Sequence, residues 1–432
     1  MHQKSIAATL CPLLIVAASA ASADDNIAPG VGNALAIEIS GRSELVKSAK
    51  AFIDQHIQDI ADEKLRAITA DAIDNSKTCI RHRAGLDGAA KAHAVETLKA
   101  EGLVDIDDEG KFPGGLMAGV FPPVNADGSE CPQLPQIFTS APGSVFGGHH
   151  SYPGGLAVHE AFNLSSALSL AANYRRAYGH LGADGLPEVT PADAPMVKPD
   201  IVIDQDAMLA APMWHDWAKM IVFQWTGTGS EFPELNFGGN GKTDKFGATG
   251  NSKTGAHHII GVAEAMSRGL SPEFVITQAS AHAAPAEGNE FMVVNWLRAA
   301  AIIARIDPVA TGYLARDPQG RLRLPPLRHL ADVAIQQALP DEPNLLVEYV
   351  LHNLSDADHT FTGPAVAEIQ IVLKAVAGRF GYDPNDAATY NTKFRNPVLA
   401  TFSAERLQIL YAAGGADAVV AEIEKLKQAG AI

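Results

Sequence analysis

The sequence has little positive charge. It contains 33 lysine and arginine residues against 49 aspartate and glutamate residues, which gives a formal net charge of −16. Each phosphate contact on a nucleic-acid-binding surface needs a compensating lysine or arginine. The charge balance therefore argues against a broad nucleic-acid groove, although it leaves room for a local basic pocket.

Aromatic residues are also few, at 6% of the chain, whereas residues that favour helices dominate. This composition favours an α-rich fold over one built from strands. Hydrophobic residues make up 47% of the chain and charged residues only 19%, so the chain can bury a sizeable core. The same balance excludes a disordered chain.

Long hydrophobic runs are absent except at the amino terminus. Residues 1–23 resemble a secretory leader, with Lys4 as its positive region, an apolar stretch over 6–18, and small residues at 21–23 before a pair of aspartates. The alternative is an uncleaved membrane anchor, which the small residues disfavour. We therefore expect an exported mature chain without a transmembrane segment, located in the periplasm or secreted.

Cysteine is rare, and one of the three cysteines, Cys11, lies in the predicted leader. Cys79 and Cys131 remain in the mature chain. In an oxidising compartment two thiols can form one disulfide, but two separate buried thiols fit the sequence equally well.

Apolar residues recur mainly at helical spacing, and convincing strand alternation is hard to find. We therefore expect an all-α fold. Its helical segments are predicted at 43–101, 156–178, 204–223, 256–268, 272–284 and 290–306, with further helices to the carboxyl end. Loops rich in proline and glycine separate them and suggest four regions: 1–23, 24–140, 141–318 and 319–432.

Histidine is the residue that points to function. Several of the 15 histidines lie in the predicted helices or just before them, in the order His149, His150, His159, His215, His257, His258 and His282. His215 is followed directly by Asp216 within an apolar stretch that we expect to be helical. Two ionisable groups facing a core are costly to bury unless they are paired or bound to a metal.

In this order of residues the chain resembles the HD-domain superfamily of metal-dependent phosphohydrolases. The segment 149–159, HHSYPGGLAVH, is similar to the entry of the first HD helix in the exoribonuclease and relaxase-associated branches. The segment 215–219, HDWAK, is similar to the family's His-Asp-x-x-Lys signature. The resemblance covers about 148–308 and implies an HD-type helical bundle with helical extensions on both sides. It implies metal ligands at His159, His215, Asp216, His258 and His282.

The family's ligand set ends with a distal aspartate, and the predicted helix at 290–306 has none at the expected positions. Asp307 is the only aspartate near its end. Either Asp307 completes the metal site, or the distal ligand is missing. Another polar cluster, formed by Asp356, Asp358 and His359, is interpreted as a helix cap or turn.

Imidazoles with one or two carboxylates suit one or two ions of Mn, Fe, Co, Ni or Zn. Helices can enclose such ions and leave positions for water and substrate. A bound metal lowers the pKa of water, which can then attack phosphorus in line. We expect catalytic roles for Asp216 and Lys219, and substrate contacts from His150 and His257, although each of these histidines could equally be structural and Lys219 a solvated side chain.

The sequence therefore predicts an exported metal-dependent phosphohydrolase or phosphodiesterase that acts on a nucleotide or another small phosphoester. One alternative is an HD-type di-iron oxygenase, since these enzymes use a similar ligand set. The other is a degenerate HD-fold binding protein, which a missing distal aspartate would support. The sequence does not define the oligomeric state.

Overall fold

The structure is a computed structural model that describes residues 25–125, 128–191, 193–194, 201–240, 251–285, 289–326 and 346–432. The leader predicted at 1–23 lies outside the described residues. Among the helices that are described, none is long and apolar enough to cross a membrane.

The prediction of an all-α fold is confirmed. The amino-terminal helices are α1 (Asn33–Arg42), α2 (Glu44–Gln58), α3 (Glu63–Asp74), α4 (Gly88–Ala100) and α5 (Gly115–Val120). The central helices are α6 (Gly155–Tyr178), α7 (Gln205–Trp214), α8 (Lys219–Val222), α9 (Ala256–Ser267), α10 (Pro272–Ala279), α11 (Glu290–Ala304) and α13 (Val347–Ser355). The carboxyl-terminal helices are α14 (His359–Val376), α15 (Ala387–Tyr390), α16 (Asn396–Phe402) and α17 (Ala404–Gln428).

Short elements complete the described chain. The 3-10 helices are η1 (Asp25–Ile27), η2 (Arg81–Arg83), η3 (Ile106–Glu109) and η4 (Ala377–Phe380), and η5 (Asn391–Arg395) is a π-helix. Two antiparallel pairs join β1 (Asn236–Phe237) to β2 (Thr254–Gly255), and β3 (Ala315–Arg316) to β4 (Leu322–Arg323). These strands are too short to form a sheet layer, so the fold is built by helix packing.

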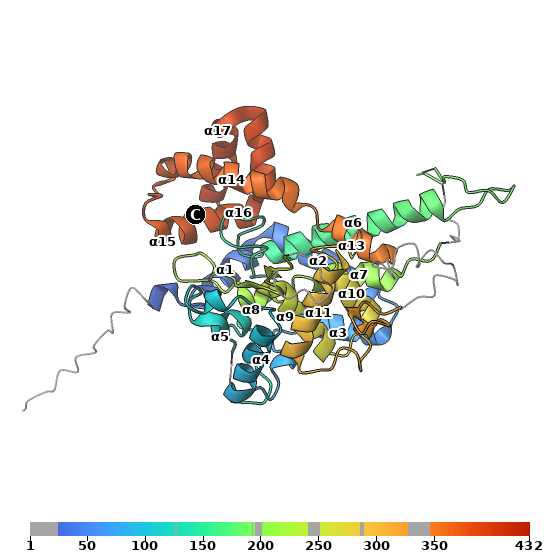
Figure 1. The fold of residues 1–432 in the computed structure, drawn as a ribbon. Helices are drawn as coiled ribbons and strands as arrows, with labels where there is room; N and C mark the ends of the chain where they lie inside the picture. The colour runs from blue at the N-terminus through green and yellow to red at the C-terminus, as the bar shows by residue number, and fades with distance from the viewer. Residues whose placement is uncertain are drawn as a thin grey trace, which may run out of the picture.

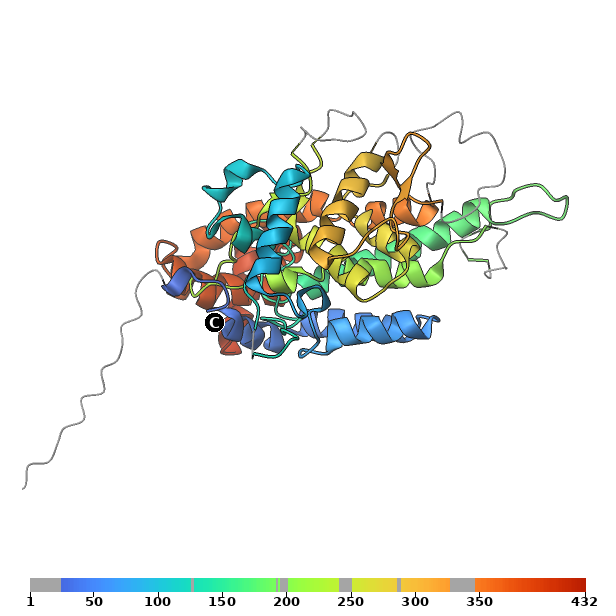
Figure 2. The same ribbon diagram turned by 60° about the horizontal axis from the view of Figure 1, so that its bottom comes forward.

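Two apolar clusters hold the helices together. The larger one joins the amino-terminal and central helices and includes Trp214, Trp217 and Trp296. The smaller one is formed mostly by α14, α16 and α17, and it also takes in Tyr152 from the segment before α6. Figures 1 and 2 show these carboxyl-terminal helices together on one side of the molecule, while α13 packs along α6. Buried contacts at Tyr152 and at α13 thus connect the carboxyl-terminal region to the centre.

Local chemistry explains where five of the helices start. The side chains of Ser43, Asp62, Asp87, Asp204 and Ser271 each accept a hydrogen bond from a free N–H of the first turn that follows. Such N-caps replace the intrahelical partners that the first turn lacks.

Two predicted helices are shorter than expected, and both corrections concern histidines. The helix predicted at 204–223 is interrupted, because residues 215–218 form turns between α7 and α8. His215 and Asp216 therefore lie in a helix break. The Gln278 amide donates a hydrogen bond to the Trp214 carbonyl oxygen at this break. The helix predicted at 272–284 ends at Ala279, so His282 lies in the loop after α10.

Cys79 and Cys131 form a disulfide, with their Cα atoms 5.3 Å apart. The structure thus selects one of the two possibilities that the sequence left open. The bond lies next to a short backbone bridge between Cys79 and Gln133, so it fastens the loop before η2 to the segment that leads to the histidine-rich loop.

Candidate metal centre

Buried histidines and aspartates from distant parts of the chain meet between the central helices and the start of α14. Among the described residues, three groups of side chains place their ligand atoms within 4.8 Å of one another. Group A contains His159, His215 and Asp216. Group B contains Asp216, His257 and His282. Group C contains His149, His150, His159 and Asp358.

Group A is extended by Asp356, which lies directly after α13. His159 Nε2 is 3.2 Å from Asp216 Oδ2 and 3.1 Å from Asp356 Oδ1. His215 Nε2 is 3.3 Å from each of the same two oxygens. Ligands bound to one metal at about 2.1 Å lie about 3.0 to 3.4 Å apart in octahedral or tetrahedral geometry. The four atoms therefore have the spacing of ligands around a common ion.

Group B uses the other oxygen of the same aspartate. Asp216 Oδ1 lies 3.1 Å from His257 Nε2, and His282 completes the group. The carboxylate of Asp216 thus presents one oxygen to each group. This is the arrangement that a carboxylate needs in order to bridge two metal ions.

In His215, His257 and His282 the ring nitrogen that faces away from the centre has a protein partner. His215 Nδ1 donates to the Pro212 carbonyl oxygen at 3.0 Å. His257 Nδ1 donates to Glu234 Oε1 at 2.5 Å. His282 Nδ1 and Thr254 Oγ1 are hydrogen bonded at 2.8 Å. Partners of this kind fix the tautomer and orientation of metal-binding histidines, leaving Nε2 for the metal.

Four of the inward-facing atoms have no such partners. His159 Nε2, His215 Nε2, His257 Nε2 and Asp216 Oδ1 are all buried and accept or donate no hydrogen bond. A buried polar atom without a partner is costly, and a cluster of such atoms requires an explanation. A cation coordinated by these lone pairs removes the cost, so the residues fit a metal ion.

The pKa shifts of His159, His215 and Asp356 show that the carboxylates favour positive charge beside them. Burial alone would lower the pKa of His159, but Asp358, Asp216 and Asp356 outweigh it and raise the pKa well above the ordinary value. Burial would likewise lower the pKa of His215, which Asp216, Glu160 and Asp356 instead raise. Burial would raise the pKa of Asp356, but the two histidines lower it well below its usual range. These directions mean that the ionised forms of Asp216 and Asp356 are favoured by positive charge beside them.

Lys219 lies at the start of α8, where its ammonium group contacts Asp216 Oδ2 and the Gly143 carbonyl oxygen. Its side chain is buried. The predicted catalytic residues Asp216 and Lys219 are therefore in contact. Lys219 also links Asp216 to the loop that precedes α6, through Gly143.

The structure brings together most of the predicted ligands but not all. His258 is buried, but its ring stacks on His282 at 4.1 Å and meets Trp296 edge to face, so it lies behind the centre. Its neighbour His257, which we expected to contact substrate, is the residue that faces Asp216. The two side chains point in different directions because successive residues of a helix lie about 100° apart around its axis.

Asp307 lies apart from these groups. It is exposed, and its carboxylate accepts hydrogen bonds from the N–H groups of Val309 and Ala310 in the turn after α11. The distal carboxylate of group A comes from Asp356 instead. From the sequence, Asp356 and Asp358 are interpreted as part of a helix cap or turn. Their backbones do flank helix ends, whereas their side chains point into the centre.

His150, the other residue expected to contact substrate, lies beside the centre in group C. Its Nε2 atom is 2.9 Å from Asp358 Oδ2, and its Nδ1 atom is 3.2 Å from the Tyr152 hydroxyl. His149 lies closer to solvent, with its ring 4.9 Å from that of His159 and 6.2 Å from that of the exposed His359.

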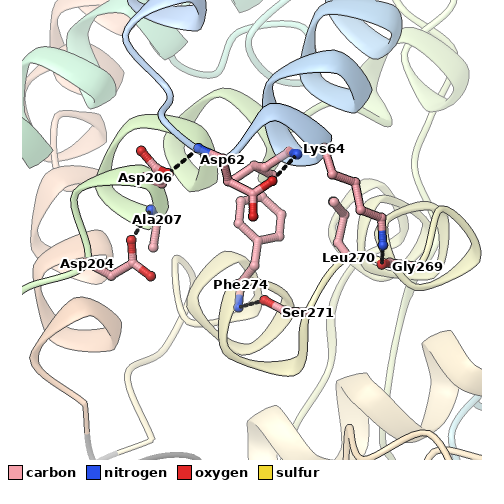
Figure 3. Close-up of a pocket in the computed structure, with 10 residues that line it drawn as sticks. Asp62, Lys64, Asp204, Asp206, Ala207, Gly269, Leu270, Ser271 and Phe274 are labelled. Atoms are coloured by element: carbon pink, nitrogen blue, oxygen red, sulfur yellow. Dashed lines mark hydrogen bonds between the residues drawn. The ribbon is translucent and has the colours of Figure 1, made fainter.

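A separate surface crevice of about 320 Å³ lies where α3, α7 and α10 begin, as Figure 3 shows. Its polar groups are used by the fold. Asp206 accepts from the N–H groups of Ala61 and Asp62, and the Lys64 ammonium donates to the Gly269 carbonyl oxygen. The crevice contains no histidine among its lining residues, so its chemistry differs from that of the buried centre.

Comparison with models of protein families, with curated proteins and with solved structures finds no match to this chain.

Proposed function

We propose that the protein is a metal-dependent phosphohydrolase or phosphodiesterase of HD type, with two metal positions that share Asp216. The observation that supports it best is the placement of the two Asp216 oxygens, one toward the imidazoles of group A and one toward His257 of group B. Buried imidazole and carboxylate ligands suit Mn, Fe, Co, Ni or Zn.

Bound ions of this kind supply a Lewis acid for a phosphoryl oxygen and an activated water at neutral pH. The residues of the chain provide the positioning. Glu234 keeps His257 in the tautomer that presents Nε2, and Pro212 does the same for His215. Lys219 fixes Asp216 and places a positive charge beside group A, where it can also favour an anionic substrate. The substrate we propose is a nucleotide or another small phosphoester.

The presence of Asp356 also bears on the alternatives. A degenerate binding protein was suggested by the missing distal carboxylate, and Asp356 supplies a carboxylate at ligand distance. A di-iron oxygenase would use the same residues, so the choice between the two enzymes depends on the reaction measured.

The test begins with elemental analysis of the purified full chain, followed by assays with a generic aryl phosphodiester after reloading with Mn²⁺, Co²⁺ or Zn²⁺. We expect bound transition metal and metal-dependent turnover, both lost in Asp216→Asn and both kept in Asp307→Asn. Turnover that survives Asp216→Asn, or a protein that binds none of these metals, contradicts the proposal. Oxygen consumption by the iron-loaded protein without phosphodiester turnover identifies the oxygenase instead.

A further inference from the structure

Group C lies on the solvent side of the proposed two-metal centre and is not needed to complete it. Its members come from two segments, the loop at 149–150 before α6 and Asp358 at the start of α14, and they meet His159 between them. The side chains of His150 and Asp358 are each only 4% exposed. A buried group of ligand atoms at this place calls for its own explanation.

Hydrogen bonding explains only part of the group. His159 Nδ1 lies 3.3 Å from Asp358 Oδ1, and His150 Nε2 lies 2.9 Å from Asp358 Oδ2. If Asp358 served only as an acceptor for these two imidazoles, His149 would have no role. Yet His149 Nδ1 is buried without a hydrogen-bond partner, and Asp358 Oδ1 also lacks one. One ligand atom from each of the four residues of group C lies within 4.8 Å of the others. This spacing, together with two unpartnered atoms, fits a cation.

The loop that carries His149 and His150 has an uncommon backbone conformation at His150. His150 has φ of +49°, a left-handed value that is uncommon for residues other than glycine. Its carbonyl oxygen accepts from the N–H groups of Gly143 and Tyr152, and a Cβ atom at Gly155 would lie 1.8 Å from that oxygen. Arg395 reaches in from η5 and donates to the carbonyl oxygen and the hydroxyl of Ser151. Strain that is stabilised from several sides is typical of functional loops.

We propose that His149, His150 and Asp358 form a third cation site, specific for a divalent transition metal, on the solvent side of His159. Two neutral imidazoles and one carboxylate are the donor set of many zinc and cobalt sites. His159 faces group A through Nε2, and its Nδ1 atom lies on the side of Asp358. The proposed ion adds positive charge that Lys219 does not supply there, because its ammonium group contacts Asp216 and Gly143. The site does not depend on the reaction catalysed at groups A and B.

The experiment counts metal ions in the full chain. The protein is stripped with a chelator and titrated with Co²⁺, followed by calorimetry and by visible absorption, which reports the coordination geometry of the bound ion. We expect about three equivalents for the wild type, one for each group. His149→Ala is expected to lose about one equivalent and leave the other two with unchanged affinity. His359→Ala, which alters an exposed ring beside His149, is the matched control and keeps all of them.

Two results would overturn the third site: a wild type that saturates with about two equivalents of Co²⁺, or an unchanged count in His149→Ala. Circular dichroism of His149→Ala verifies that the fold is intact, and His150→Gln provides a second variant with the same expected loss. Saturation of the wild type at about two equivalents still agrees with the proposed two-metal enzyme. A chain that binds no Co²⁺ contradicts both proposals, and three bound ions without phosphodiester turnover contradict only the proposed function.

Discussion

Asp356 Oδ1 lies 3.1 Å from His159 Nε2, although the two residues are far apart in the sequence. His159 belongs to α6, and Asp356 follows directly after α13. The same oxygen is 3.3 Å from His215 Nε2. The carboxylate that completes group A therefore comes from the carboxyl-terminal region, in which the sequence contains no interpretable motif. This relationship leads to the first prediction.

Asp356→Asn should weaken binding of the group A metal by more than the roughly 10- to 100-fold that loss of an outer partner costs, because a direct ligand loses its charge. Asp307→Asn is the matched control, since Asp307 is exposed and serves a turn. Competition with a chelator of known affinity measures both. Equal affinities in the two variants would remove Asp356 from the centre.

His257→Ala should remove the metal of group B, whereas His258→Phe should leave metal binding unchanged. The reason is that His257 Nε2 faces Asp216, while the His258 ring only packs on His282 and Trp296. Metal content after dialysis, measured on both variants, decides between the two histidines. The reverse pattern would restore the assignment that the sequence suggested.

Glu234→Gln should lower the affinity of group B for metal by about 10- to 100-fold while group A is unaffected. The Glu234 carboxylate accepts the Nδ1 proton of His257 and also the backbone N–H of that residue, so it fixes the ring. Glu96→Gln changes an exposed glutamate on α4 and serves as the control. A Co²⁺ titration that is identical for both variants would show that the ring needs no such support.

Glu231 should make the protein less stable as pH rises. Burial raises the pKa of this carboxyl to about 8, with Arg395 opposing part of the shift. Below pH 4.5 both states hold the proton, and between 4.5 and 8 only the unfolded chain ionises. The free energy of unfolding then falls by about 1.4 kcal/mol per pH unit. Glu231→Gln removes this loss.

The measurement for Glu231 is the difference in Tm between Glu231→Gln and the wild type. We expect it to become more positive from pH 5 to pH 9, since the other titrating groups are common to both proteins. A difference that stays constant over this range would mean that the carboxyl ionises at its ordinary pKa in the folded chain.

The sequence was informative where chemistry is local. Apolar periodicity predicted α6 and α9 closely, and the adjacency of His215 and Asp216 inside an apolar stretch predicted that the two would be buried together. The resemblance of residues 149–159 and 215–219 to HD segments, which the structure leaves untested, pointed to His159 and Lys219 as site residues.

The remaining site residues depend on tertiary contacts that local spacing does not encode. Choosing between His257 and His258 requires the rotation of α9 about its axis, which only its packing against α11 and the position of Glu234 fixes. Placing Asp356 requires knowing that α13 packs on α6, across a long stretch of intervening chain. An Asp-x-Asp-His sequence at a helix junction satisfies a cap equally well, so the residues alone could not separate the two roles.

The contribution of Asp356 and Asp358 has a consequence for how the protein matures. A nascent or truncated chain that ends before residue 346 contains the segments that carry His159, His215, Asp216, His257 and His282, but it has only one of the three carboxylates that face His159. Such a chain would bind metal weakly, because two of the three negative charges beside His159 would be missing. The proposed metal centre therefore predicts that tight metal capture follows docking of the segment at 356–358, late in the life of each molecule.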